Sequence, residues 1–221
     1  MTNGLMHAQV TITGTTPLLM HADNIDWADQ MDDWKKNPKN KKVSKAGDDR
    51  TPAWRWIGCL YHDGKVLTMP AENIMKTIME GAAQVPTGKG QKTFKAQSQS
   101  GLLCQDFHWP LEIQGNPVSF NAVAALKDDD LSFRDQMEQV QTLGFDLFVK
   151  RAKIGMQKHI RVRPRFEKWS CRGTIIIIDS QITKDLLQSF LNIAGQYKGL
   201  GDWRPGAKTP GPFGMFTATV K

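Results

Sequence analysis

The sequence predicts an α+β fold in which helices cover one face of a mostly antiparallel sheet. Segments with strand and helix patterns alternate along its 221 residues. The run GTIIIID at 173–179 contains five consecutive β-branched residues, which is typical of a buried central strand. After Pro70, apolar side chains repeat at helical spacing. Hydrophobic residues make up 40% and charged residues 23% of the chain, as in a globular protein, so we expect a single domain over residues 1–221.

The first third of the chain contains an expected strand, a short helix and a long insertion. Residues 8–14 alternate apolar and polar side chains and predict a strand. The acidic stretch that follows predicts a short helix with Asp23 or Asn24 as its N-cap. Residues 35–55 begin with a lysine-rich, nearly apolar-free sequence and predict a long mobile insertion. In 56–69, Asp63-Gly64 between apolar residues predicts a hairpin.

The remaining elements complete an alternating order of strands and helices. A helix is expected after Pro70, and a second mobile polar insertion over 85–101. Thr183 is the expected cap of a helix that ends at Gly199, before a last strand. Between them we expect several short strands over 102–126, a helix over 131–140 and strands over 143–179. The simplest template for this order is the ferredoxin-like βαββαβ unit, with long insertions projecting from it.

Positive charge is concentrated in one segment. The chain carries a net charge of +7, and residues 150–172 alone contain nine basic residues against one acidic residue, Glu167. The rest of the chain is therefore close to neutral. Such a concentration favours polyanions as partners, nucleic acid first, although a solvated basic face is the simpler alternative.

Within this segment, arginines alternate with apolar residues in IRVRPRF. Arg161, Arg163 and Arg165 are expected on one face of a strand, about 6.6 Å apart, with Lys158 extending the row. Few acidic residues lie near them in sequence. Such a row can follow the phosphates of a single strand, and guanidinium groups also stack on bases. The alternative is a solvated face with cross-strand ion pairs.

Lysines in the two insertions are further candidates for nonspecific phosphate contacts. The alternative is a pair of solvated loops, the first anchored by core tryptophans. The candidate lysines are Lys35, Lys36, Lys39, Lys41 and Lys42 in the first insertion, and Lys89, Lys92 and Lys95 in the second.

The glycine-rich segment 199–214 (GLGDWRPGAKTPGPFG) is the expected second wall of a groove whose first wall is the arginine strand. Gly199 and Gly201 would allow positive φ and let backbone N–H groups approach an anion. Arg204 and Lys208 would add charge, and Trp203 would be either a stacking face or a core anchor. A purely structural turn is the alternative.

Catalytic and metal-binding patterns are weak. The five histidines are scattered, and the three cysteines form no CxxC pair, so we expect no metal, cofactor or disulfide framework. His21 as a general base, with Asp23 and Asp26 nearby, is the catalytic alternative. No apolar run approaches the ~20 residues of a membrane helix, and no signal peptide is evident, so the expected compartment is the cytoplasm.

Three strings together resemble the RAMP superfamily, the repeat-associated proteins of CRISPR systems. LTMPAENIMKTIMEGA is similar to its strand-Pro-helix segment, with Ala71 and Glu72 where Gly and Ser are usual. GLGDWRPGAKTPGPFGMF resembles its C-terminal glycine-rich loop and last strand, and ITGTTPLLMH its first strand. RPRF-x-x-W and GLGDWRP are also similar to small bacteriophage proteins.

The resemblance implies an RRM-like core with a thumb-like loop, found in bacterial cells and their phages. Members of the superfamily polymerise along guide RNA in ribonucleoprotein complexes or cleave RNA precursors. We therefore expect a non-catalytic, sequence-tolerant protein that binds single-stranded RNA or DNA and assembles side by side along the strand. The alternatives are a metal-independent endoribonuclease of the same fold and a phage protein that binds an acidic host or assembly partner.

Overall fold

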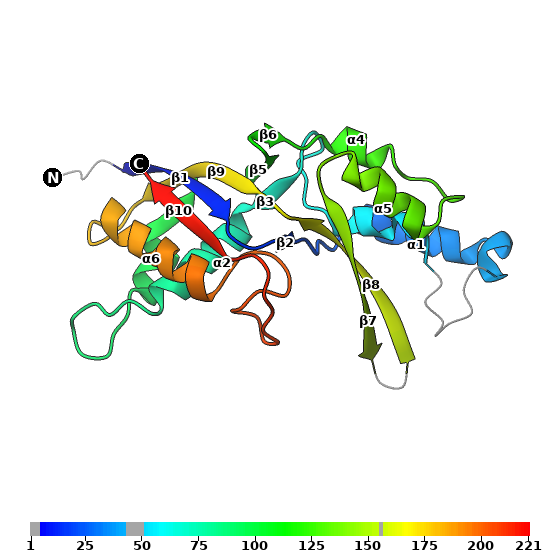
Figure 1. Cartoon of the computed structure of the whole chain (residues 1–221). Helices are drawn as coiled ribbons and strands as arrows, with labels where there is room; N and C mark the ends of the chain where they lie inside the picture. The colour runs from blue at the N-terminus through cyan, green and yellow to red at the C-terminus, as the bar shows by residue number, and fades with distance from the viewer. Residues whose placement is uncertain (1–4, 43–50, 155–156) are drawn as a thin grey trace.

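The computed structural model describes residues 5–42, 51–154 and 157–221, and for residues 41–42, 151–154 and 157–159 it describes the backbone alone. The chain has an α+β structure with two antiparallel sheets in an elongated molecule of two lobes (Figure 1). Within these ranges the larger sheet contains seven strands: β1 (Met6–Gly14), β3 (Thr68–Pro70), β4 (Leu102–Cys104), β5 (His108–Ile113), β6 (Asn116–Pro117), β9 (Ser170–Ile177) and β10 (Phe216–Val220). The smaller sheet contains β2 (Leu18–Leu19), β8 (Gln157–Phe166) and β7 (Asp146–Ile154), in that order.

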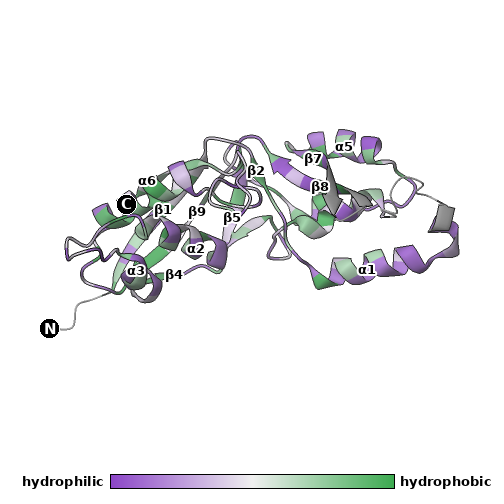
Figure 2. Ribbon diagram, turned by 90° about the horizontal axis from the view of Figure 1, so that it is seen from below, coloured by the Kyte–Doolittle hydropathy of each residue, from purple (hydrophilic) through white to green (hydrophobic). Residues whose placement is uncertain are grey.

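The helices divide between the lobes. Figure 2 shows α2, α3 and α6 at one end and α1 and α5 at the other. The helices are α1 (Ile25–Lys36), α2 (Ala71–Ala82), α3 (Lys95–Gly101), α4 (Phe120–Ala124), α5 (Phe133–Gln141) and α6 (Lys184–Tyr197), with 3-10 turns η1 (Pro38–Lys42) and η2 (Ala53–Cys59). No helix in the described ranges is both long and apolar enough to cross a membrane.

The larger sheet is covered by helices α2 and α6. Its strand order is β10-β1-β9-β5-β3, with β4 also paired to β9. Alternation along β1 buries Ala8, Val10 and Ile12, and the same alternation along β9 buries Ile175 and Ile177. The helices approach closely through glycines: a Cβ on Gly81 of α2 would lie 2.2 Å from the Phe190 carbonyl oxygen of α6. Small residues therefore set the spacing of the layer that backs the sheet.

Tryptophans build the core of the smaller lobe. Trp54 and Trp56 of η2 are buried, with the Trp54 ring centroid 5.6 Å from that of Trp27 in α1. Trp56 Nε1 donates a 2.8 Å hydrogen bond to Gln136 of α5, and its ring lies 5.8 Å from Phe145. These contacts attach η2, α1 and α5 to the β7–β8 hairpin.

Most expected elements are confirmed. The first strand, the central β9, the strands over 143–179, the last strand and the helices that begin after Pro70 and Thr183 all form. The Asn24 side chain caps α1, and the Thr183 side chain caps α6 by accepting from Leu186 N. Gly199 ends α6 with φ of 68°.

Four segments differ from the expected secondary structure, each in a polar or mixed stretch. Residues 56–59 belong to η2 rather than to a hairpin strand, because two buried tryptophans pack this turn into the core. The expected turn at Asp63-Gly64 does form, between His62 and Leu67, which make an antiparallel bridge. Residues 53–55 of the first insertion begin η2, and 38–42 form η1; 43–50 lie outside the described residues. The second insertion contains α3, and residues 120–124 form α4 instead of a strand, capped by the Ser119 side chain.

Candidate nucleic-acid interface

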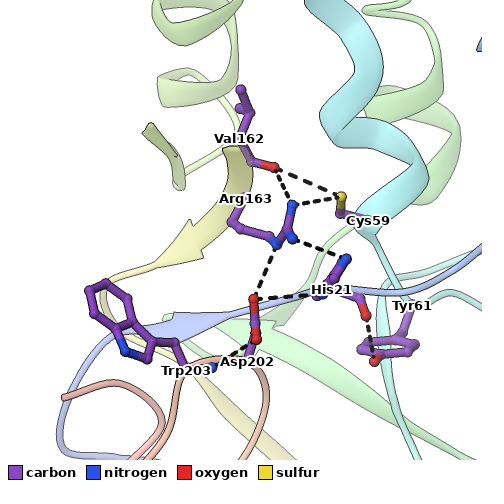
Figure 3. A network of polar contacts seen from close by, with 7 residues as sticks. All are labelled: His21, Cys59, Tyr61, Val162, Arg163, Asp202 and Trp203. Carbon is purple, nitrogen blue, oxygen red and sulfur yellow. Dashed lines mark hydrogen bonds and ion pairs between the residues drawn. The ribbon is translucent and has the colours of Figure 1, made fainter. Parts of the chain in front are cut away.

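Arg163 of β8 lies at the centre of a polar network between the lobes (Figure 3). Its side chain is 9% exposed. Nε donates to Asp202 Oδ2 at 3.1 Å, Nη2 donates to His21 Nε2 at 3.0 Å, and Nη1 donates to the Val162 carbonyl at 3.1 Å. The network thereby joins β8, the glycine-rich segment and the chain between β2 and α1.

The protonation of His21 follows from this geometry. A guanidinium group only donates hydrogen bonds, so Nε2 of His21 accepts and Nδ1 carries the proton, 3.7 Å from Asp202 Oδ2. Burial and the neighbouring Arg163 charge lower the pKa of His21. The basic nitrogen of the neutral ring is therefore already occupied. This arrangement does not favour His21 as a general base.

The other members of the catalytic alternative are not gathered around a reaction centre. Asp23 and Asp26 are exposed, and Asp26 donates its backbone N–H to the Asn24 cap. In the part of the chain that the structure describes, no group of three His, Cys, Asp or Glu side chains is placed to hold a metal ion.

Two of the three strand arginines have carboxylate partners. Arg165 forms a bidentate pair with Asp146 of β7, with Nε–Oδ1 at 2.8 Å and Nη2–Oδ2 at 2.6 Å. Arg163 is paired with Asp202. The alternative of cross-strand ion pairs therefore applies to Arg165, and Arg163 is paired across the lobes, with partners 19 and 39 residues away in sequence. Only Arg161 is exposed with no carboxylate partner among the described residues; the Lys158 side chain lies outside them.

The glycine-rich segment is more structural than expected. Arg204 is 8% exposed and forms a bidentate pair with Glu80 of α2, at 2.6 and 2.9 Å, so it is not available to a phosphate. The Gly199 N–H donates to the Ala194 carbonyl at 2.8 Å. At Gly201, φ is 81° and a Cβ would lie 2.4 Å from the Leu19 carbonyl oxygen. Arg204 and the Gly199 N–H therefore have partners within the chain, which favours the structural-turn alternative for them, and Gly201 provides close packing against β2.

The two expected walls nevertheless enclose one cavity of about 400 Å³. Arg161 and Arg163 contribute from β8, and Trp203 and Lys208 from the glycine-rich segment. Phe148 and Lys150 of β7 complete the cavity, because they lie directly opposite Arg163 and Arg161 in the strand register.

Further hollows meet at the same network. One of about 440 Å³ is lined by His21, Lys35, Arg55, Arg161 and Arg163, among others. A smaller one of about 140 Å³ lies between His21, Asp202 and Lys76 of α2. These three hollows share lining residues, and we name them together the junction groove. Arg161 lines two of them, so one exposed cation borders both hollows.

The candidate lysines do not form one surface. Lys35 lines the junction groove, whereas Lys36 pairs with Asp32 at 2.9 Å and Lys39 is exposed on η1. Lys41 and Lys42 belong to η1 by backbone alone, since their side chains lie outside the described residues. The second insertion lies far from β8, in the larger lobe (Figure 1). Its candidate lysines are exposed and line none of these hollows, and their contact with phosphate stays a prediction: Lys89, Lys92 and Lys95.

Sequence reasoning missed several groove residues, among them Phe148, Lys150 and Asp202. A signal for Phe148 and Lys150 was present in the sequence, because they alternate at period two just before the arginine strand. If the two segments form a hairpin, such residues lie opposite the arginines. Asp202 had no comparable signal.

No protein-family model matches the chain, and no curated protein matches its sequence. The resemblance to the RAMP superfamily therefore rests on the three strings quoted above.

Proposed function

We propose that the protein is a non-catalytic, sequence-tolerant binder of single-stranded RNA or DNA, with the strand lying in the junction groove. The observation that carries this proposal is the position of Arg161, an exposed cation that lines two neighbouring cavities. Lys150 lies directly opposite it in the strand register, and Lys208 and Lys35 line the same cavities from other elements. Flexible exposed cations around a groove are the usual means of following a phosphate backbone.

The topology supports the family part of the proposal. The chain order β1, α2, β5, β9, α6, β10 and the sheet order β10-β1-β9-β5 are those of a ferredoxin-like βαββαβ unit. The smaller lobe would then be a pair of insertions in this core, as in a RAMP protein with a thumb. We extend the proposal to side-by-side assembly along the strand, alone or with other subunits of a ribonucleoprotein complex.

The endoribonuclease alternative is less well supported, because Arg163 occupies the basic nitrogen of His21. An acidic protein partner would use the same exposed cations. Binding measurements with oligonucleotides distinguish the acidic partner from nucleic acid.

The test is fluorescence anisotropy of labelled oligouridylate and oligothymidylate between about 50 and 200 mM salt. We expect binding that weakens steeply with salt, with a logarithmic slope of about −0.7 for each phosphate neutralised. The double variant Arg161→Ala/Lys208→Ala should bind weakly, and the magnitude of its logarithmic salt slope should be smaller by about 1.4. Lys89→Ala/Lys92→Ala removes the same charge far from the groove and is the matched control. Absence of binding at low salt contradicts the proposed function. Equal losses of affinity in the two double variants contradict the junction groove as the binding site.

A further inference from the structure

We propose that the cavity beside Trp203 is a nucleotide subsite, in which one unpaired base stacks on the indole while Arg161 and Lys208 contact its phosphates. This inference rests on the proposed function and adds to it a site that recognises the flat face of a base. Charge alone would treat a sugar–phosphate chain and a complete nucleic acid alike, whereas a stacking site requires the base.

The backbone of Trp203 is held in an unfavourable conformation. Its φ is 47°, a region that bulky residues rarely adopt and that costs on the order of 1–3 kcal/mol. The Asp202 carboxylate accepts from the Trp203 N–H at 2.9 Å, and the Trp203 carbonyl accepts from Phe213 N at 3.4 Å. A glycine would adopt this φ without strain, whereas at Trp203 the surrounding hydrogen bonds hold a bulky side chain in it.

The Trp203 side chain is half-buried and packs against neighbouring aromatic rings, with part of its surface left exposed. Its Nε1 donates to the Pro210 carbonyl at 3.1 Å, which fixes the ring within its own loop. The Phe148 and Phe213 rings lie at 6.0 and 5.6 Å and are tilted against it rather than stacked. The hydrogen bond from Nε1 and the contacts with the two phenylalanine rings therefore fix the orientation of the indole ring.

One face of the ring is covered by a lysine side chain. Lys150, which is exposed, places Nζ 3.5 Å from the Trp203 ring centroid. The group over the ring at this point is therefore a flexible surface side chain, which can move aside for a ligand. A planar base can occupy the same face, with the Lys150 ammonium turning to the phosphate.

Size and charge suit a nucleotide. The cavity of about 400 Å³ lies within the range of small-ligand sites, roughly 300–1,000 Å³. Lys150 and Arg161 are direct partners across β7 and β8, and like charges in this position repel each other. The neighbouring Arg163 is also a cation, so it does not reduce this repulsion, and the carboxylate near it, Asp202, is paired with Arg163 itself. A phosphate between the two cations would relieve it, next to an aromatic face for the base.

The test compares oligothymidylate with an abasic oligomer of equal length and equal phosphate number. Wild-type protein should bind the thymidylate about tenfold or more tightly, since base–aromatic stacking contributes about 1–3 kcal/mol per base. Trp203→Leu should bind both oligomers equally, with the salt slope unchanged. Trp203→Phe keeps a ring and should restore most of the preference. Phe107→Leu is the matched control, because this exposed aromatic residue lines none of the cavities described.

The outcomes separate the two proposals. Salt-dependent binding of both oligomers with equal affinity by wild-type protein overturns the subsite and leaves the proposed function standing. No binding of either oligomer overturns both. A preference that persists unchanged in Trp203→Leu overturns the role of Trp203. If Trp203→Leu does not fold, the abasic comparison on wild-type protein decides the inference.

Discussion

The Asp202 carboxylate and the Arg163 guanidinium form an ion pair, with Nε 3.1 Å from Oδ2, between residues 39 positions apart. The pair joins β8 of the smaller sheet to the segment that follows α6 of the larger lobe. The two arginines that line the groove therefore differ. Arg163 is buried and its charge is neutralised by Asp202, whereas Arg161 is exposed and its charge is available to a ligand.

Removing the Asp202 carboxylate should destabilise the protein. Asp202→Asn leaves the buried Arg163 charge without its ion pair, and we expect a loss of about 2 kcal/mol in the free energy of unfolding. The value is below that of a fully buried pair, because the Asp202 side chain is 35% exposed. Urea denaturation measures the loss. Asp23→Asn, an exposed carboxylate in the same groove, is the control, and equal midpoints for the two variants would contradict the prediction.

Arg204 and Lys208, both candidates for phosphate contacts, should behave differently. Arg204→Ala leaves Glu80 without its bidentate partner in a mostly buried pair, so we expect a loss of about 3 kcal/mol in stability. Lys208→Ala removes an exposed charge and should leave the melting temperature within about 1 °C. Thermal denaturation of the two variants checks this. Equal melting temperatures would show that Arg204 has no structural role.

Stability should fall in mild acid. Burial is the main cause that lowers the pKa of both His21 and His62 from the ordinary 6.5. At a pH between the lowered pKa of the folded protein and 6.5, these histidines are protonated in the unfolded chain but neutral in the folded protein. Their contribution to the free energy of unfolding is therefore fully present above pH 6.5 and is lost as the pH falls below it. His21→Gln, whose amide oxygen can still accept from Arg163, should reduce this loss.

The measurement is the urea midpoint at about pH 8 and about pH 5. His7→Gln removes a surface histidine and is the control. A pH dependence in His21→Gln identical to that of wild type would show that His21 does not contribute.

Gly214 should tolerate no side chain. Its φ is 73°, and a Cβ there would lie 1.8 Å from the Leu200 carbonyl oxygen. Gly214→Ala combines backbone strain with a clash against backbone, so we expect a loss of at least about 3 kcal/mol. Gly64 has φ of 90° but nothing within 4 Å of a Cβ, and Gly64→Ala should cost only about 1–2 kcal/mol. Comparable urea midpoints for the two variants would argue against tight packing at Gly214.

Much of the secondary structure could be predicted from local patterns. The alternation of β1, the β-branched β9, the capped helix α6 and the glycine that ends it each depend on neighbouring residues alone. The predictions that failed concern segments such as 53–59, where two tryptophans pack against residues far along the chain. Local patterns predicted a loop up to residue 55 and a strand from residue 56, whereas burial of the two rings produces one 3-10 turn over 53–59.

The sequence by itself determined the α+β composition, the concentration of positive charge in 150–172 and the juxtaposition of an arginine strand with a glycine-rich wall. The tertiary structure alone decided which charges remain available. Arg163, Arg165 and Arg204 look equivalent to Arg161 in sequence, yet each has a carboxylate partner, the most distant 124 residues away. The reason is physical: periodicity determines the face to which a side chain points, whereas strand register and packing determine what lies opposite.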